Sequence, residues 1–262
     1  MLSEYFSKPN NKSNVDEIVY NYLQLENDLQ SNLEELNFGP DISYIYKPLT
    51  YASDLHKKFV TKFLFSHRNV LFLGMNPGPW GMCQTGIPFG EINAVKNYLQ
   101  IDGEVNIPQN IHPSRPILGL NCTNKEISGQ RFWELINEES DGDPFRFFKH
   151  CFIHNYFPFA LMNKNAKNIT PAELKSDKRK HLENICDESL RSIIELLNVS
   201  IIVAIGKYVE KRSLEVVKQF NLCNVKVINI RHPSPRALGT AENWKIETIN
   251  QLKSNNIIQL FK

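Results

Sequence analysis

The strongest constraint on the fold of this chain is a set of four short apolar runs in which polar and apolar residues do not alternate. Strands of a parallel sheet have this composition because helices cover both of their faces. Helical patterns separate the runs, as expected when strand, helix and strand follow one another in a parallel sheet. The runs are residues 69–74 (NVLFLG), 151–155 (CFIHN), 199–205 (VSIIVAI) and 225–230 (VKVINI). We therefore predict an α/β fold with helices on both faces of a parallel sheet.

Apolar residues at helical spacing predict the main helices. The clearest start is the segment 170–173 (TPAE), where Thr170 is a typical N-cap, Pro171 occupies the first turn and Glu173 stands at the third position. The segment 37–40 (NFGP) ends the first helix. The predicted helices span residues 15–36, 50–66, 171–197, 207–220 and 241–252.

Length and composition indicate an ordinary globular protein. A chain of 262 residues with 42% apolar and 22% charged residues can bury a full core. Neither an internal repeat nor a linker is evident, so we predict one domain over residues 14–262 after a polar, disordered tail at 1–13. No apolar run reaches the roughly 18 residues of a membrane span, and the N-terminus lacks the apolar core of a secretion signal. A net charge of +2 neither indicates nor excludes nucleic acid.

The cysteines argue against a metal cluster. Five cysteines occur at positions 83, 122, 151, 186 and 223, and no Cys-x-x-Cys pair is present. Zinc ribbons and most iron–sulfur frameworks require such pairs. We therefore expect free thiols in a reducing compartment.

Three unusual segments follow predicted strands. They are residues 74–82 (GMNPGPWGM), His154-Asn155 and residues 232–236 (HPSPR). In open α/β sheets, ligands bind beyond the carboxyl ends of the strands. Because proline and glycine fix the backbone of such loops, the three segments can together hold a rigid site.

Two of these loops offer candidate catalytic side chains. Asn76 lies among prolines and glycines and has an amide with both a donor and an acceptor, although the loop also reads as a plain tight turn. It is not a phosphate-binding P-loop, because no Lys-Ser/Thr follows. His232 precedes a proline, which favours an extended conformation that can project the imidazole into a cleft. The alternative interpretation of His232 is a histidine that makes only structural hydrogen bonds. The alternative interpretation of Arg236, in the same segment, is a solvated surface charge.

Two further residues suit the recognition of a planar base. The amide of Asn155 can pair with an adjacent carbonyl and N–H on a base edge. Phe89, in the segment 86–90 (GIPFG), is a candidate stacking platform. The alternative interpretations are a turn-forming asparagine and a core phenylalanine.

These segments closely resemble the single-strand-selective monofunctional uracil-DNA glycosylases of the uracil-DNA glycosylase superfamily. The resemblance runs from about residue 36 to residue 244, and the segments keep the family order. Besides 74–82 and 232–236, they are residues 84–91 (QTGIPFGE), 115–120 (RPILGL), 127–133 (ISGQRFW), 154–155 (HN) and 168–174 (NITPAEL).

The resemblance implies a three-layer α/β/α sandwich around a central, mainly parallel four-stranded sheet. It implies hydrolysis of the N-glycosidic bond of uracil in DNA, without metal or cofactor and without strand cleavage. The resemblance also implies that 5-hydroxymethyluracil and related oxidised uracils are substrates, in single-stranded and double-stranded DNA. We expect a monomeric DNA-repair enzyme that acts in the nucleus of a eukaryote, or otherwise in the cytoplasm.

The resemblance also implies the role of each site residue. Asn76 matches the residue that positions the attacking water, and His232 matches the one that hydrogen-bonds the uracil 2-carbonyl. Phe89 matches the stacking aromatic residue and Asn155 the reader of the base edge. The remaining matches are the pocket residues Met75, Gly78 and Met82 and the DNA-binding segment Ser234, Pro235 and Arg236, which wedges into the duplex.

The residue chemistry agrees with these roles. A donor at His232 would stabilise the charge that develops on the leaving uracil. Asn76 can only orient water, which suffices when the transition state resembles an oxocarbenium ion. Two alternatives remain open: a non-catalytic binder of damaged DNA and an enzyme that acts on free nucleosides. The basic residues expected on the DNA face are Lys164, Lys167, Lys207, Arg231 and Lys245, while residues 178–180 (KRK) are expected on a solvated helix face.

Overall fold

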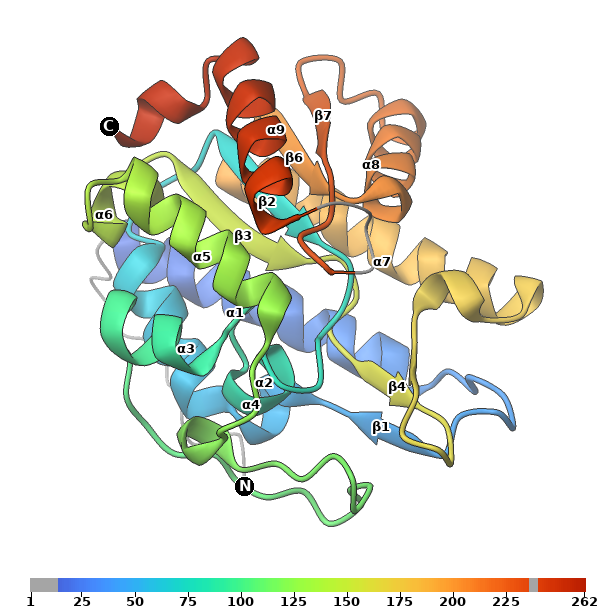
Figure 1. The fold of residues 1–262 in the computed structure, drawn as a ribbon. Coiled ribbons are helices and arrows are strands. Elements are labelled where there is room, and N and C mark those ends of the chain that lie inside the picture. Colours follow the sequence, from blue (N-terminus) through green and yellow to red (C-terminus); the bar gives the residue numbers. More distant parts are fainter. Residues whose placement is uncertain (1–13, 236–239) are drawn as a thin grey trace.

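The computed structural model describes residues 14–235 and 240–262, and its centre is a four-stranded parallel sheet (Figure 1). The strand order is β3-β2-β6-β7. The strands are β2 (Val70–Gly74), β3 (Cys151–Asn155), β6 (Ile201–Ile205) and β7 (Lys226–Ile230). All three pairings are parallel. The predicted fold class and the four predicted strands are confirmed.

Helices cover both faces of this sheet. In Figure 1, α5 (Ile127–Glu139) and α9 (Ala241–Ser254) lie in front of the strands, and α1 (Asn14–Glu34) and α7 (Ser176–Leu197) lie behind them. Helix α8 (Lys207–Gln219) packs against α7. The remaining helices are α2 (Pro48–Tyr51), α3 (Ser53–Phe63), α4 (Met82–Thr85), α6 (Pro144–Phe148) and the single turns η2 (Ala94–Tyr98), η3 (Gly119–Asn121), η4 (Pro171–Glu173) and η5 (Ile258–Phe261).

Two helix predictions were wrong in detail. The predicted helix 50–66 is the pair α2 and α3, which is interrupted at Ala52. The predicted helix 171–197 starts later, because the expected capping box of Thr170 and Glu173 caps only the turn η4. Leu174 is then extended and buried, and α7 begins at Ser176. The local capping box therefore begins a single turn rather than the long helix.

A second, small sheet was not predicted. Strands β1 (Tyr44–Tyr46), β4 (Ala160–Met162) and β5 (Asn168–Ile169) pair antiparallel in the order β1-β4-β5. Strands of two or three residues are too short to show a periodic pattern in the sequence. This sheet supports the segment that carries Asn168 and Thr170 at the edge of the main sheet.

The core lies on both faces of the main sheet. Every residue of β2 and β3 is buried, which explains why their sequences do not alternate. The principal buried apolar cluster extends from Ile18 to Phe261. Among the helices of residues 14–235 and 240–262, none combines the length and apolar character needed to cross a bilayer.

The central strand provides a test of this core. Leu71 on β2 is fully buried, so Leu71→Ala should lower the free energy of unfolding by about 2–5 kcal/mol, through lost burial and a residual cavity. Chemical denaturation measures this change. Ile107→Ala is the control, because Ile107 is 70% exposed and its loss should change stability by less than about 0.5 kcal/mol. Equal effects of the two variants would contradict the placement of β2.

Candidate functional site

A cavity of about 280 Å³ opens at the carboxyl ends of the parallel strands. It is lined by residues that follow β2, β3 and β7, as predicted from the three loop segments. Among the predicted site residues, it brings together Met75, Asn76, Gly78, Met82, Phe89, Asn155, His232 and Ser234. Pro235 is exposed and does not line the cavity, and Arg236 lies outside the described residues.

The floor of the cavity depends on a missing side chain at Gly74. Gly74 pairs with Asn155 across β2 and β3. A Cβ atom at residue 74 would lie 2.2 Å from Asn155 Oδ1 and 2.8 Å from Phe89 Cε2. Asn155 is buried and its Nδ2 donates to Met82 Sδ at 3.0 Å. The glycine therefore lets the amide of Asn155 and the ring of Phe89 meet over the end of β2.

Helix α5 holds Phe89 in place. Phe89 has a positive φ of 54°, and its ring stacks on Phe132 with centroids 5.1 Å apart. Its carbonyl accepts a hydrogen bond from Trp133 Nε1 at 3.0 Å. A Cβ at Gly129 would lie only 2.2 Å from the same carbonyl oxygen. These contacts fix the ring at the cavity wall, 5.9 Å from the imidazole of His232.

The hydrogen bonds of His232 determine which ring nitrogen carries its proton. The backbone N–H of Ser234 donates to Nδ1 at 3.1 Å, so Nδ1 is unprotonated. Burial lowers the pKa of His232 to about 4, so the ring is neutral near pH 7. Its proton must then lie on Nε2. His232 is therefore a neutral donor through Nε2–H.

Helices α5 and α9 anchor the loop of His232. Arg131 Nη1 donates to the carbonyl of Pro233 at 3.0 Å. Trp244 Nε1 donates to the carbonyl of Arg231 at 2.7 Å. The two bonds fix the backbone on either side of the imidazole.

The proline-rich loop of Asn76 is fastened by a buried glutamine. Gln84 Nε2 donates to the carbonyls of Pro79 and Pro116, each at 3.0 Å, and its Oε1 accepts from the N–H of Leu118 at 2.8 Å. Asn76 itself makes one long contact, from Nδ2 to the carbonyl of Pro77 at 3.4 Å. Gln84 therefore ties this loop to the segment of Pro116 and Leu118, and Asn76 lines the cavity with one long contact to the protein.

Four lining residues were not predicted from the sequence: Glu126, Ser128, Asn168 and Thr170. Glu126 is the N-cap of α5 and accepts a hydrogen bond from the N–H of Gly129. Glutamate is not among the preferred N-caps, so no sequence pattern pointed to Glu126. Asn168 Nδ2 lies 3.5 Å from the carbonyl of Pro77, and its buried Oδ1 has no partner among the described residues.

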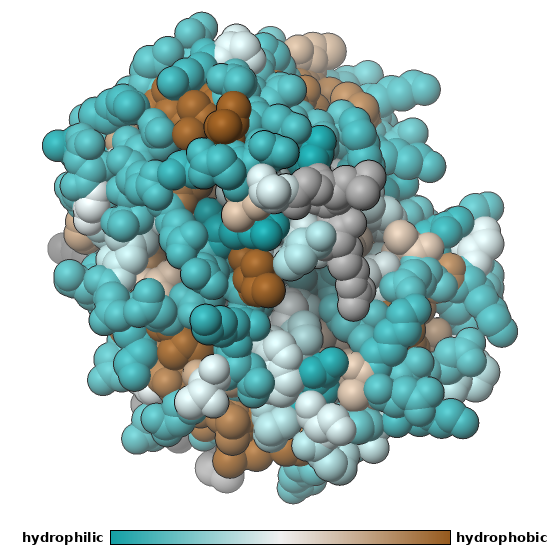
Figure 2. Space-filling model, in the orientation of Figure 1, coloured by the Kyte–Doolittle hydropathy of each residue, from teal (hydrophilic) through white to brown (hydrophobic). Residues whose placement is uncertain are grey.

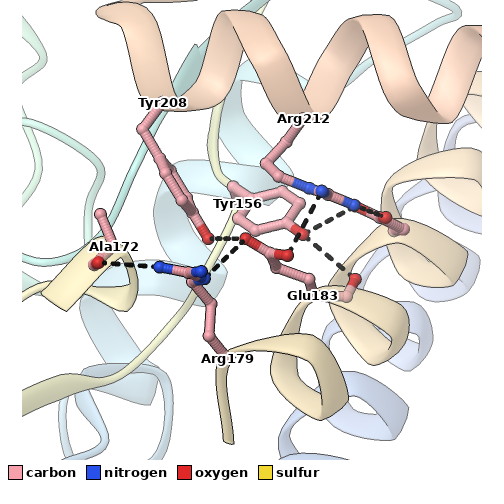
Figure 3. Close-up of polar contacts among 7 residues, drawn as sticks. Tyr156, Ala172, Arg179, Glu183, Tyr208 and Arg212 are labelled. Carbon is pink, nitrogen blue, oxygen red and sulfur yellow. Dashed lines mark hydrogen bonds and ion pairs between the residues drawn. The ribbon is translucent and has the colours of Figure 1, made fainter. Parts of the chain in front are cut away.

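A polar network surrounds Tyr156, the residue that follows Asn155 in the chain (Figure 3). The hydroxyl of Tyr156 donates to Asp187 Oδ1 at 2.7 Å. Arg212 of α8 pairs with Asp187 and, at 3.3 Å, with Glu183. The network also reaches the turn η4, because Arg179 pairs with Glu183 and donates to the carbonyl of Ala172 at 3.3 Å (Figure 3).

A second buried network supports the other side of Asn155. His154 Nδ1 lies 2.8 Å from the hydroxyl of Tyr22 and 3.6 Å from Glu26 Oε1. Glu26 also pairs with His56 at 2.6 Å. Burial opposes ionisation of Glu26, but the two histidines outweigh it and lower the pKa of this carboxyl to about 2. Asn155 therefore stands between two neighbours that are each held by buried polar contacts.

The basic residues expected on the DNA face are mostly ion-paired. Lys167, Lys207, Arg231 and Lys245 each pair with a glutamate within 4.0 Å. Such exposed pairs are weak, and phosphate can compete for them. Hydrophilic residues cover most of the face shown in Figure 2. Within residues 14–235 and 240–262, no group of three His, Cys, Asp or Glu side chains is arranged to hold a metal ion.

The fold and the cavity define a parallel α/β protein with a small site at the carboxyl ends of its strands, which polar side chains line together with Met75, Met82 and Phe89. A family model described as the uracil DNA glycosylase superfamily matches residues 62–253. This chain belongs to that superfamily.

Relatives and solved structures support this assignment. The chain is 40% identical over 234 residues to the single-strand selective monofunctional uracil DNA glycosylase of Bos taurus, covering 88% of this chain and 85% of the relative. It is 38% identical over 239 residues to the Mus musculus protein of the same description, covering 91% and 85%. The crystal structure of wild-type Pedobacter heparinus SMUG2 matches with a TM-score of 0.62 at 20% identity, covering 90% of this chain and 98% of that one. This structural likeness bears on the fold alone.

The state of His232 can be tested by NMR. In the protein labelled with ¹⁵N at its histidines, the ring resonances of His232 should show a protonated Nε2 and an unprotonated Nδ1. These resonances should not titrate above about pH 5. Because the folded pKa lies below the unfolded value of about 6.5, the neutral ring contributes stability that is lost as the pH falls from that value toward 4. The exposed His67 lies outside the cavity and is the internal reference. A His232 ring charged at pH 6 would contradict the assignment.

Proposed function

We propose that this chain hydrolyses the N-glycosidic bond of uracil in single- and double-stranded DNA and leaves an abasic site without strand cleavage. The proposed substrates include 5-hydroxymethyluracil and related oxidised uracils. The observation that carries the proposal is the neutral Nε2–H donor of His232, which shares one cavity with the amides of Asn76 and Asn155. Membership of the uracil DNA glycosylase superfamily supports it.

His232 would act on the leaving group. When the C1′–N1 bond breaks, its electron pair goes to uracil, and negative charge develops on the 2-carbonyl. A fixed N–H donor aimed at this oxygen lowers the barrier, because the donor needs no reorganisation during the reaction. Two hydrogen bonds keep this donor in position. Arg131 donates to the carbonyl of Pro233, and Trp244 of α9 donates to the carbonyl of Arg231.

Asn155 and Phe89 would recognise the base. The ring of Phe89 offers a stacking surface, which is worth about 1–3 kcal/mol for a base. The amide of Asn155 is buried, so a base with the wrong edge would leave its polar atoms unpaired. Cytosine presents an amino group where uracil has a carbonyl, and such a mismatch can reduce the rate by about 10⁴-fold.

Asn76 would orient the attacking water. Its amide makes few contacts with the protein and faces the cavity, so it is available to hold a water molecule. We assign Met75, Gly78 and Met82 to the pocket wall. Met82 in addition receives the N–H of Asn155.

Entry of the base requires extrusion from the stack, which costs a few kcal/mol in a duplex and less in a single strand. We propose that Ser234, Pro235 and Arg236 contact the DNA and fill the gap that the base leaves. The position of Pro235 outside the cavity suits contact with the strand rather than with the base.

We further propose that residues 14–262 act as one domain and as a monomer on DNA, without metal or cofactor. For a eukaryotic source, the expected compartment is the nucleus. Two other functions remain as outcomes of the test below: a non-catalytic binder of damaged DNA and a hydrolase that acts on free nucleosides.

The direct test is base release from a uracil-containing oligonucleotide in the presence of EDTA, followed by alkali to cleave abasic sites. The wild-type chain should release uracil, and His232→Leu should slow release by about 10²–10³-fold. Asn76→Ala should abolish release and retain lesion binding. His67→Leu, an exposed histidine outside the cavity, is the control and should match the wild type.

Each competing function has its own outcome in this assay. Binding without release by the wild-type chain would indicate the non-catalytic binder. Release from deoxyuridine as efficient as release from the oligonucleotide would indicate a nucleoside hydrolase.

The wedge can be tested on two substrates. Arg236→Ala should slow base release from duplex DNA more than from single-stranded DNA, because only the duplex must be opened and filled. Arg146→Ala is the control, since Arg146 pairs with Asp141 beside α6 and does not line the cavity. Equal effects of Arg236→Ala on both substrates would contradict the proposal that Arg236 fills the gap in the duplex.

A further inference from the structure

Hydrolysis of the glycosidic bond releases one proton from the attacking water, and neither predicted catalytic side chain can take it. The amide of Asn76 does not accept a proton near neutral pH. His232 accepts the N–H of Ser234 at Nδ1, and its Nε2 already carries a proton. If the proposed function holds, the site therefore needs another proton acceptor.

Glu126 is the carboxylate available for this task. It is the only acidic side chain among the described residues that line the cavity. Its side chain lies against the loop of Asn76: a Cβ at Gly81 would come 2.8 Å from Glu126 Cγ, and one at Gly78 would come 3.6 Å from Oε1. Since both positions are glycine, no side chain separates Oε1 from this loop, two residues after Asn76.

A capping role alone does not explain a glutamate at this position. Shorter side chains are the preferred N-caps, and the structure uses Asp143 for α6 and Thr240 for α9. Glu126 caps α5 through Oε2, which accepts from the N–H of Gly129. The longer side chain places its second oxygen, Oε1, toward Gly78 at the cavity.

We propose that Glu126 is a catalytic carboxylate that accepts the proton of the attacking water and faces the positive charge on the deoxyribose. The C1′–N1 bond breaks, and its electron pair leaves with uracil as an anion. A lone pair of the water oxygen forms the new C1′–O bond. The water proton passes to the carboxylate of Glu126, which then releases it to the uracil anion or to solvent.

The surroundings of Glu126 favour proton uptake. Burial raises the pKa of this carboxyl above its ordinary value, and the nearby charge of Glu91 raises it further. The N–H of Gly129 and Ser128 on α5 oppose this shift. The imidazole of His232, at the same cavity, is neutral and contributes no charge near pH 7. Glu126 is therefore a stronger base than an ordinary glutamate. Its Oε2 is at the same time held at the start of α5 by the N–H of Gly129.

The decisive experiment compares Glu126→Gln with the wild-type chain under single-turnover conditions on a uracil oligonucleotide. Glutamine keeps an oxygen that can cap α5 and removes only the charge. The rate of base release should fall by about 10²-fold, the lower end for general-base catalysis. Affinity for an oligonucleotide with non-hydrolysable 2′-fluoro-deoxyuridine should not change. The matched control is Asp143→Asn, the same exchange at the exposed N-cap of α6, and its rate should equal that of the wild type.

A pH profile supplies a second readout. The wild-type rate should fall as the pH drops through the raised pKa of Glu126, because the ionised form is the acceptor. The Gln variant should lack this acid limb. A folded Gln variant as fast as the wild type, or one that keeps the acid limb, would overturn the proposal.

Two further outcomes, an unfolded Gln variant and an inactive wild-type chain, can also be interpreted. If the Gln variant does not fold, a wild-type profile that is flat through the acid range overturns the proposal without any variant. If the wild-type chain releases no uracil at all, the proposed function fails, whereas an active wild type with an equally active Gln variant removes only the role of Glu126.

Discussion

The geometry of the site depends on the close approach of Asn155 and Phe89 over the bare backbone of Gly74. Parallel pairing of β2 with β3 sets Gly74 opposite Asn155, and a single methyl group at residue 74 would overlap both neighbours. One backbone position therefore controls the placement of the Asn155 amide and the Phe89 ring together. The rest of the cavity is arranged around this contact, with α5 behind Phe89 and the polar networks behind Asn155.

Helix α5 connects the loops that surround the cavity. Glu126 lies against the loop of Asn76, Gly129 lies beneath the carbonyl of Phe89, and Arg131 holds the loop of His232. These contacts come from one and a half turns of helix. Rigid support of this kind is what the donor proposed at His232 needs for preorganised electrostatic stabilisation. The same helix also brings the neutral donor His232 and the carboxyl group of Glu126 to one cavity.

Much of this arrangement could be predicted from the sequence. The four apolar runs predicted the parallel sheet, and the carboxyl-end rule placed Asn76, Asn155 and His232 near one another. The tautomer of His232 could not be predicted, because it depends on a hydrogen bond from Ser234. Glu126 was also missed, because its position against Gly81 arises from tertiary packing between segments 45 residues apart in the numbering, 126 against 81. The small sheet was missed because its strands are too short to carry a pattern.

The most direct measurement is a crystal structure of this chain with an oligonucleotide that contains 2′-fluoro-deoxyuridine. The extruded uracil should lie in the cavity with its ring on Phe89, its 2-carbonyl within hydrogen-bond distance of His232 Nε2 and its edge on the amide of Asn155. A uracil bound elsewhere on the surface, or one in the cavity with its 2-carbonyl turned away from His232, would contradict the central claim that these loops form one base-binding site.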